Sequence, residues 1–161
     1  MEQLLDLTAG LPERVLAAGE SLVHAGEEAD HIYVLLEGRL VVRRDGEDLL
    51  AFDEPGSCIG EKALLLDQAH HSSVVASERS RVRVVEDAAS SLHDNPALLF
   101  AVAVLLARRL EMVEAYLGDL KHQYRDHEGG LGMIGEVLTT LTSHHGQPLT
   151  PGSEREPDPL Y

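Results

Sequence analysis

The chain has 161 residues, 43% of them hydrophobic, and a formal net charge of −15 at pH 7. A chain of this length holds one domain with small appendages, and acidic residues spread along it would repel a phosphate backbone, which disfavours direct DNA binding. The single cysteine, Cys58, excludes an internal disulfide framework, and the N-terminus lacks the charged and apolar regions of a secretory signal, so we expect a protein of the reducing cytoplasm.

Residues 1–13 are expected to hold a short N-terminal helix. Leu4, Leu5 and Leu7 give residues 2–9 an apolar face, and Gly10 and Pro12 end the pattern. We expect this helix to pack on the strands that follow it.

Residues 14–94 are expected to form an antiparallel β-roll or jelly roll. Short apolar or β-branched runs alternate here with glycine, proline and aspartate residues that turn the chain. The runs lie at residues 21–24, 31–37, 40–44, 49–52, 72–76 and 82–86. Asp45 and Gly46 tolerate the positive φ angles of a type I′ turn, so we expect a tight hairpin there. Many short strands at this spacing are typical of a small barrel or jelly roll.

A long helix is expected over residues 95–128. Asn95 can cap it, Pro96 suits its first position, and no glycine or proline follows until Gly118. Its apolar stretch, residues 97–107, is about half of the roughly 20 residues that cross a bilayer, so we expect a buried helix and no membrane partner. Residues 129–145 are expected to form one more short helix, and residues 146–161, with four prolines, a disordered tail.

One face of the long helix carries an apolar seam with the alternating spacing of three and four residues found in coiled coils. Its members are Leu106, Leu110, Val113, Leu117, Leu120 and Tyr124. An exposed row of leucines needs cover, and the same helix from a second copy provides it, so we expect a homodimer. The alternative is that the helix folds back onto its own roll.

Two sequence segments and the long helix that follows them resemble those of a known family. Residues 19–38 read GESLVHAGEEADHIYVLLEG, residues 56–65 read GSCIGEKALL, and the long helix follows. Over about residues 15–125 this order resembles the cyclic nucleotide-binding domain of the catabolite activator and protein kinase regulatory subunit superfamily. The resemblance implies a mostly β fold with helices (α+β): an antiparallel β-roll followed by a long dimerisation helix, here without the helix-turn-helix of the transcription-factor members.

The resemblance also implies a ligand-binding cassette from Gly60 to about Val74. The residues expected to line the site are Gly60, Glu61, Ala63, His70, His71, Ser72 and Ser73. Gly60 lets the backbone approach a ligand closely, Glu61 can accept a hydrogen bond from a ribose hydroxyl, and the amides at the start of residues 61–65 point at an anion. The alternative is that Gly60 only relieves a bend and Glu61 only caps the short helix.

The cassette departs from the family pattern in its cation. Ligand-binding members place an arginine against the cyclic phosphate, and the matching residue here is His70 or His71. Histidine has an unperturbed pKa of about 6.5 and is mostly neutral at cytoplasmic pH. Protonation at lower pH would supply the missing positive charge, so we predict that ligand binding tightens as the pH falls from about 7.5 to 6. Lys62, where the family prefers an apolar residue, is expected to be solvated. Ser72 and Ser73 can each donate a hydroxyl to a phosphate, but on a strand only one points inward.

The residues leave two functions open. The first is a stand-alone, non-enzymatic sensor of cyclic AMP or cyclic GMP that signals through an unknown effector protein, with no other cofactor expected. The second is a ligand-free domain that serves as a dimeric interaction subunit. A metal-dependent jelly-roll enzyme is disfavoured because adjacent histidines, such as His70 and His71, face opposite sides of a strand. Cys58 lies in an apolar strand context, where a thiol stays protonated and inert.

Overall fold

The computed structural model describes residues 2–123, with side chains up to residue 119. The described part divides into two units, with Arg109 the last residue of the first unit and Leu110 the first residue of the second. The first unit carries the strands and the candidate site.

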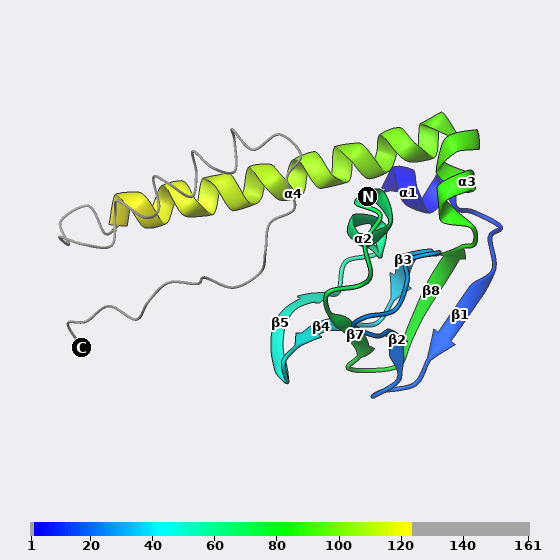
Figure 1. Ribbon diagram of the computed structural model, residues 1–161, viewed down its shortest axis with the longest axis horizontal. Coiled ribbons are helices and arrows are strands. Elements are labelled where there is room, and N and C mark those ends of the chain that lie inside the picture. The colour runs from blue at the N-terminus through cyan, green and yellow to red at the C-terminus, as the bar shows by residue number, and fades with distance from the viewer. Residues whose placement is uncertain (1, 124–161) are drawn as a thin grey trace. The chain divides into compact units, whose positions relative to one another are not determined.

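Eight strands of the described residues form two antiparallel four-stranded sheets (Figure 1). Sheet A has the order β1 (Glu13–Leu16), β8 (Ser80–Val85), β3 (Ile32–Glu37) and β6 (Cys58–Ile59). Sheet B has the order β2 (Ser21–Val23), β7 (Ser73–Ala76), β4 (Leu40–Arg44) and β5 (Glu47–Phe52). This arrangement confirms the predicted antiparallel β-roll.

The hairpin between β4 and β5 forms where the sequence predicts it. Asp45 and Gly46 have φ angles of 53° and 85°, as the two central residues of a type I′ turn require. Two strands were missed: β1, and β6, whose two residues are too few to give an alternating pattern. Both become strands by pairing, β1 along β8 and β6 along β3.

Four helices accompany the sheets among the described residues: α1 (Glu2–Leu7), α2 (Glu61–Leu65), α3 (Ala88–Asp94) and α4 (Pro96–Gln123). Figure 1 shows α1, α2 and α3 gathered at one end of the roll. Oδ1 of Asn95 accepts a hydrogen bond from the backbone N–H of Leu98 at 3.1 Å, which confirms the predicted cap, and Pro96 opens α4. Helix α3 was not predicted, and its residues had been assigned to the roll. Residues 124–128 of the predicted long helix, the predicted short helix and the predicted tail lie outside the described residues.

Two apolar cores divide the first unit. The inner core lies between the sheets and includes Leu35 of β3 and Val74 of β7. The outer core lies between sheet A and the helices, where Ile32 and Val34 of β3 meet residues of α1, α3 and the first part of α4. Alternate side chains of β3 therefore serve both cores, and the first unit has three layers.

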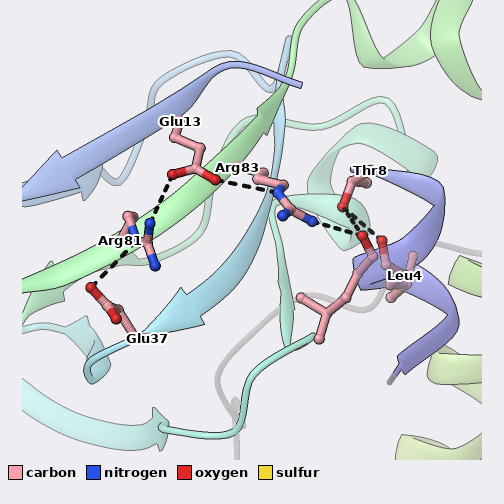
Figure 2. A network of polar contacts seen from close by, with 7 residues as sticks. Leu4, Thr8, Glu13, Glu37, Arg81 and Arg83 are labelled. Carbon is pink, nitrogen blue, oxygen red and sulfur yellow. Dashed lines mark hydrogen bonds and ion pairs between the residues drawn. The ribbon is translucent and has the colours of Figure 1, made fainter. Parts of the chain in front are cut away.

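A polar network ties α1 to strands β1, β8 and β3 of sheet A (Figure 2). Arg83 donates a hydrogen bond from Nη1 to the carbonyl oxygen of Leu5 at 2.7 Å, and Arg81 pairs with both Glu13 and Glu37. Such partly exposed ion pairs add little stability each. The bond to the Leu5 carbonyl instead fixes where α1 ends on the sheet.

The apolar seam of α4 runs across the boundary between the two units. Leu106 is partly buried against the outer core of the first unit, in which one face of α4 before it is buried through Leu98, Ala101, Val102 and Leu105. In the second unit Leu110 and Val113 are about half exposed, at 47% and 48%, and Leu117 is partly buried. The side chains of Leu120 and Tyr124 lie outside the described residues. No helix of residues 2–123 is apolar enough over a sufficient length to span a membrane.

Candidate functional site

The candidate cassette opens at the turn from β6 into α2. Gly60 has a φ of 94°, in the left-handed region, and a Cβ added there would lie 2.8 Å from the carbonyl oxygen of His31. Glycine is thus required both by its backbone conformation and by a close neighbour. This requirement supports the reading in which Gly60 serves the bend, and it leaves its predicted role toward a ligand untested.

Glu61 is the buried acidic group of the site. The residue is only 4% exposed, and its Oε1 forms an ion pair and hydrogen bond with Nη1 of Arg109 in α4. Arg109 also donates from Nη2 to the carbonyl oxygen of Cys58 at 2.8 Å, and its guanidinium stands 5.0 Å from the centre of the Phe52 ring. One arginine therefore connects α4 to β6, α2 and β5.

Burial and Arg109 act on the ionisation of Glu61 in opposite directions. Loss of water around the side chain raises the pKa of Glu61, and the charge of Arg109 offsets part of that rise. Burial has the larger effect, so the carboxylate form depends on its arginine partner. An ionised Glu61 can accept hydrogen bonds only, which suits a donor such as a hydroxyl group.

The far end of the cassette is fastened to the loop after β2. The backbone N–H of His70 donates to the oxygen of Glu27 at 2.8 Å, and the oxygen of His70 accepts from the N–H of Gly26 at 2.7 Å. Burial lowers the pKa of His70, with opposing contributions from Glu27 and Asp30. His70 is thus a weaker base than a free imidazole, which argues against its supplying a positive charge at neutral pH.

The remaining predicted site residues point in different directions. His71 is exposed, with Nε2 3.0 Å from Oε1 of Gln68. Ser72 accepts a hydrogen bond from Nε of Arg44 at 3.1 Å, whereas Oγ of Ser73 accepts one from the backbone of Ala25 at 3.0 Å. The two serines thus lie on opposite faces, as strand alternation predicts.

The other residues singled out around the cassette divide by burial. Ala63 is buried, and Lys62 is exposed as predicted. Burial raises the pKa of the Cys58 thiol well above its usual value even though Arg109 lies nearby, so the thiol stays protonated. Among residues 2–123 no group of three histidine, cysteine, aspartate or glutamate residues is placed to hold a metal ion.

Sequence reasoning missed two arginines that contact the cassette, Arg109 and Arg44. Arg109 lies 48 residues after Glu61, and Arg44 lies 28 residues before Ser72. For Arg44 one signal was present, because it sits two residues after the inward-facing Val42 on a strand. No comparable pattern indicated that Arg109, one of several charged residues on an amphipathic helix, would contact the cassette.

Comparisons with known proteins agree with this architecture. The family model for the cyclic nucleotide-binding domain matches residues 13–89. A cGMP-dependent protein kinase of Caenorhabditis elegans is 35% identical over 75 residues, which cover 47% of this chain and 10% of the kinase. The chain spans 10% or less of the length of the curated cGMP-dependent kinases that it matches.

Solved structures match a larger share of the chain. The N-terminal domain of a transcriptional regulator from Streptomyces coelicolor A3(2) is 30% identical with a TM-score of 0.51, covering 70% of this chain and 85% of that chain. The regulatory subunit of a cAMP-independent protein kinase A from Trypanosoma brucei is 26% identical with a TM-score of 0.51, covering 60% of this chain and 34% of that one.

Proposed function

The chain belongs to the cyclic nucleotide-binding domain family, and we propose that it is a regulatory module that binds cyclic AMP or cyclic GMP and signals through a partner protein. The proposal draws on relatives that include a cGMP-dependent kinase. In this role the protein is cytoplasmic and has no catalytic activity of its own.

The observation that carries the proposal is the buried Glu61 paired with Arg109. A buried ion pair adds little to stability, because an apolar pair of similar volume would pack at least as well. A carboxylate held at this position therefore calls for a functional reason, and accepting a hydrogen bond from a ribose hydroxyl supplies one. Because Arg109 belongs to α4, a ligand that contacts Glu61 also acts on α4.

The output passes through α4. We propose that the seam of Leu106, Leu110, Val113, Leu117, Leu120 and Tyr124 pairs with the same helix of a second copy, which makes the protein a homodimer. A change in the Glu61–Arg109 pair would then alter the geometry of a dimer helix, and an effector protein would read that change. Direct DNA contact is not part of the proposal, since the chain carries a net charge of −15.

Two observations favour a second candidate, a ligand-free domain that acts as a dimeric interaction subunit. The cassette holds histidines where a phosphate-binding arginine is expected, and Glu61 is already satisfied by Arg109. One similar structure is named as the regulatory subunit of a cAMP-independent kinase, so relatives with this fold include one described as independent of cyclic AMP.

Thermal unfolding with and without millimolar cyclic AMP or cyclic GMP separates the two candidates. A ligand that binds only the folded state stabilises it by RT ln(1 + [L]/Kd), or about 2.7 kcal/mol at a hundredfold excess over Kd. We expect a rise in melting temperature with at least one nucleotide. The 2′-deoxy form of that nucleotide lacks the hydroxyl assigned to Glu61 and should give a smaller rise. No rise with either nucleotide would leave the ligand-free candidate standing.

A further inference from the structure

Arg44, the last residue of β4, lies on the inner face of sheet B. In the pairing of β4 with β7, Val42 stands opposite Val74 and Arg43 opposite Ser73, so Arg44 continues the register toward Ser72. Val42 and Val74 both pack in the inner core, and alternation places Arg44 and Ser72 on that same face. The hydrogen bond of 3.1 Å from Nε of Arg44 to Oγ of Ser72 agrees with this placement.

Arg44 forms no ion pair with the residues whose side chains the structure describes. Its neighbour Arg43 points to the outer face and forms an ion pair with Asp48 at 2.5 Å, whereas no carboxylate of the described residues lies within the 4.0 Å of an ion pair with Arg44. The Arg44 side chain is nevertheless partly buried. Among the described residues the Arg44 side chain makes one hydrogen bond, to a serine hydroxyl, so its guanidinium retains donors for an anion in a chain otherwise rich in negative charge.

Ser72, the partner of Arg44, belongs to the end of the cassette that returns toward its beginning. Cε1 of His70 comes within 3.6 Å of the position a Cβ would take on Gly60, so the end of the cassette closes on its beginning. Ser72 follows His70 by two residues. A ligand that contacts Glu61, next to Gly60, would reach Arg44 by extending past His70 toward Ser72.

We propose that Arg44 and Ser72 form an anion subsite that binds the cyclic phosphate of the ligand, so that β4 supplies the cation absent from the cassette. The inference rests on the proposed function. The phosphate diester is a monoanion whose two free oxygens match the planar fork of a guanidinium. Ser72, which accepts from Arg44, keeps its own proton for donation to a phosphate oxygen.

Matched variants of adjacent residues test the subsite by calorimetric titration with cyclic AMP and cyclic GMP. Arg44→Gln should weaken binding of the preferred nucleotide by about 10- to 100-fold, the loss expected for one charge-assisted contact. Arg43→Gln removes the same charge from the outer face and should stay within about twofold. The corresponding nucleoside, which lacks the phosphate, should bind the original protein and Arg44→Gln alike.

The outcomes separate the subsite from the proposed function. If the original protein binds a nucleotide and Arg44→Gln binds it equally well, the subsite is wrong and the proposed function stands. If Arg44→Gln does not fold, Arg44→Lys keeps the charge without the fork and should still lose affinity severalfold. If the original protein binds neither nucleotide, the proposed function fails, and a titration with inorganic phosphate decides the subsite. A saturable shift in the NMR signal of the Arg44 Nε–H supports it, and an unchanged signal overturns it.

Discussion

The ionisation of Glu61 depends mainly on Arg109. Burial raises its pKa above the ordinary value of 4.5, and Arg109 is the larger of the two nearby positive charges that lower it. The folded state therefore holds the protonated acid more readily than the unfolded chain does. Stability falls as the pH rises from the pKa of the unfolded chain to the higher folded-state pKa, and the full cost of burying the carboxylate is present above the latter. Removal of Arg109 should enlarge that cost, because the carboxylate would then be buried without its partner.

We predict that Arg109→Met lowers the free energy of unfolding by about 2 kcal/mol at pH 7, measured by urea denaturation. This is less than the roughly 3–5 kcal/mol for breaking a fully buried pair, because the Arg109 side chain is 32% exposed. The loss should shrink as the pH is lowered from 7 toward 5, because protonation of Glu61 removes the unpaired buried charge.

Two companion variants check this account of Arg109. Arg108→Met changes the exposed neighbour, which forms no ion pair within residues 2–123, and should cost little. Adding Glu61→Gln to Arg109→Met should recover most of the loss, since the buried charge is gone. Equal losses at pH 7 and pH 5 would contradict the role given to Glu61 ionisation.

At the level of single residues, the sequence predicts site residues that belong to one short motif. It does not predict the side chains from distant parts of the chain that contact them. The Gly60–Glu61 step and the opposite faces of Ser72 and Ser73 follow from the local pattern and from strand alternation. Arg44 and Arg109 reach the cassette only through the pairing of β4 with β7 and the packing of α4. Strand alternation predicts the inner face for Arg44, but no spacing within the chain predicts its contact with Ser72 or that of Arg109 with Glu61.

The turn from β3 to β4 illustrates how one element fits another. Gly38 has a φ of 93°, and a Cβ added there would lie 2.6 Å from the carbonyl oxygen of Arg79, in the turn before β8. We predict that Gly38→Ala lowers the free energy of unfolding by about 3 kcal/mol, because backbone strain and overlap with a neighbouring turn add together.

Gly46→Ala provides the matched control for Gly38→Ala. Gly46 has a φ of 85° and no atom within 4 Å of its added Cβ, so only backbone strain applies, and about 1 kcal/mol should be lost. Urea denaturation of both variants measures the difference. Equal losses would show that the overlap at Gly38 relaxes at no cost.

The elements themselves were predictable where local chemistry decides them. The type I′ hairpin at Asp45 and Gly46 and the start of α4 at Pro96 depend on turn and cap residues that act within a few positions. The two residues of β6 become a strand only because β3 lies beside them, and α3 fills the short interval between β8 and Asn95. Such elements are fixed by packing, which a single sequence does not display.

The molecule as a whole combines a strongly acidic surface with an apolar stripe on α4. Self-repulsion of a chain with charge −15 opposes close approach of two copies in general. Association would therefore need a specific apolar contact, and we propose that the seam supplies it where Leu110 and Val113 are about half exposed. Added salt should strengthen such a dimer by screening the repulsion.

We predict that the purified protein is a dimer of about 35 kDa, twice the 17.5 kDa of one chain, and that Leu110→Asp with Val113→Asp converts it to a monomer. Two carboxylates placed on the seam would face like charges from the partner and lose the apolar contact. Met112→Asp adds a carboxylate at a site 72% exposed and off the seam, so that variant should remain dimeric. Sedimentation equilibrium measures the masses, and circular dichroism checks that the helix survives each change. If the double variant remains a dimer, the interface lies elsewhere. If the unmodified protein is itself a monomer, α4 must signal without a second copy.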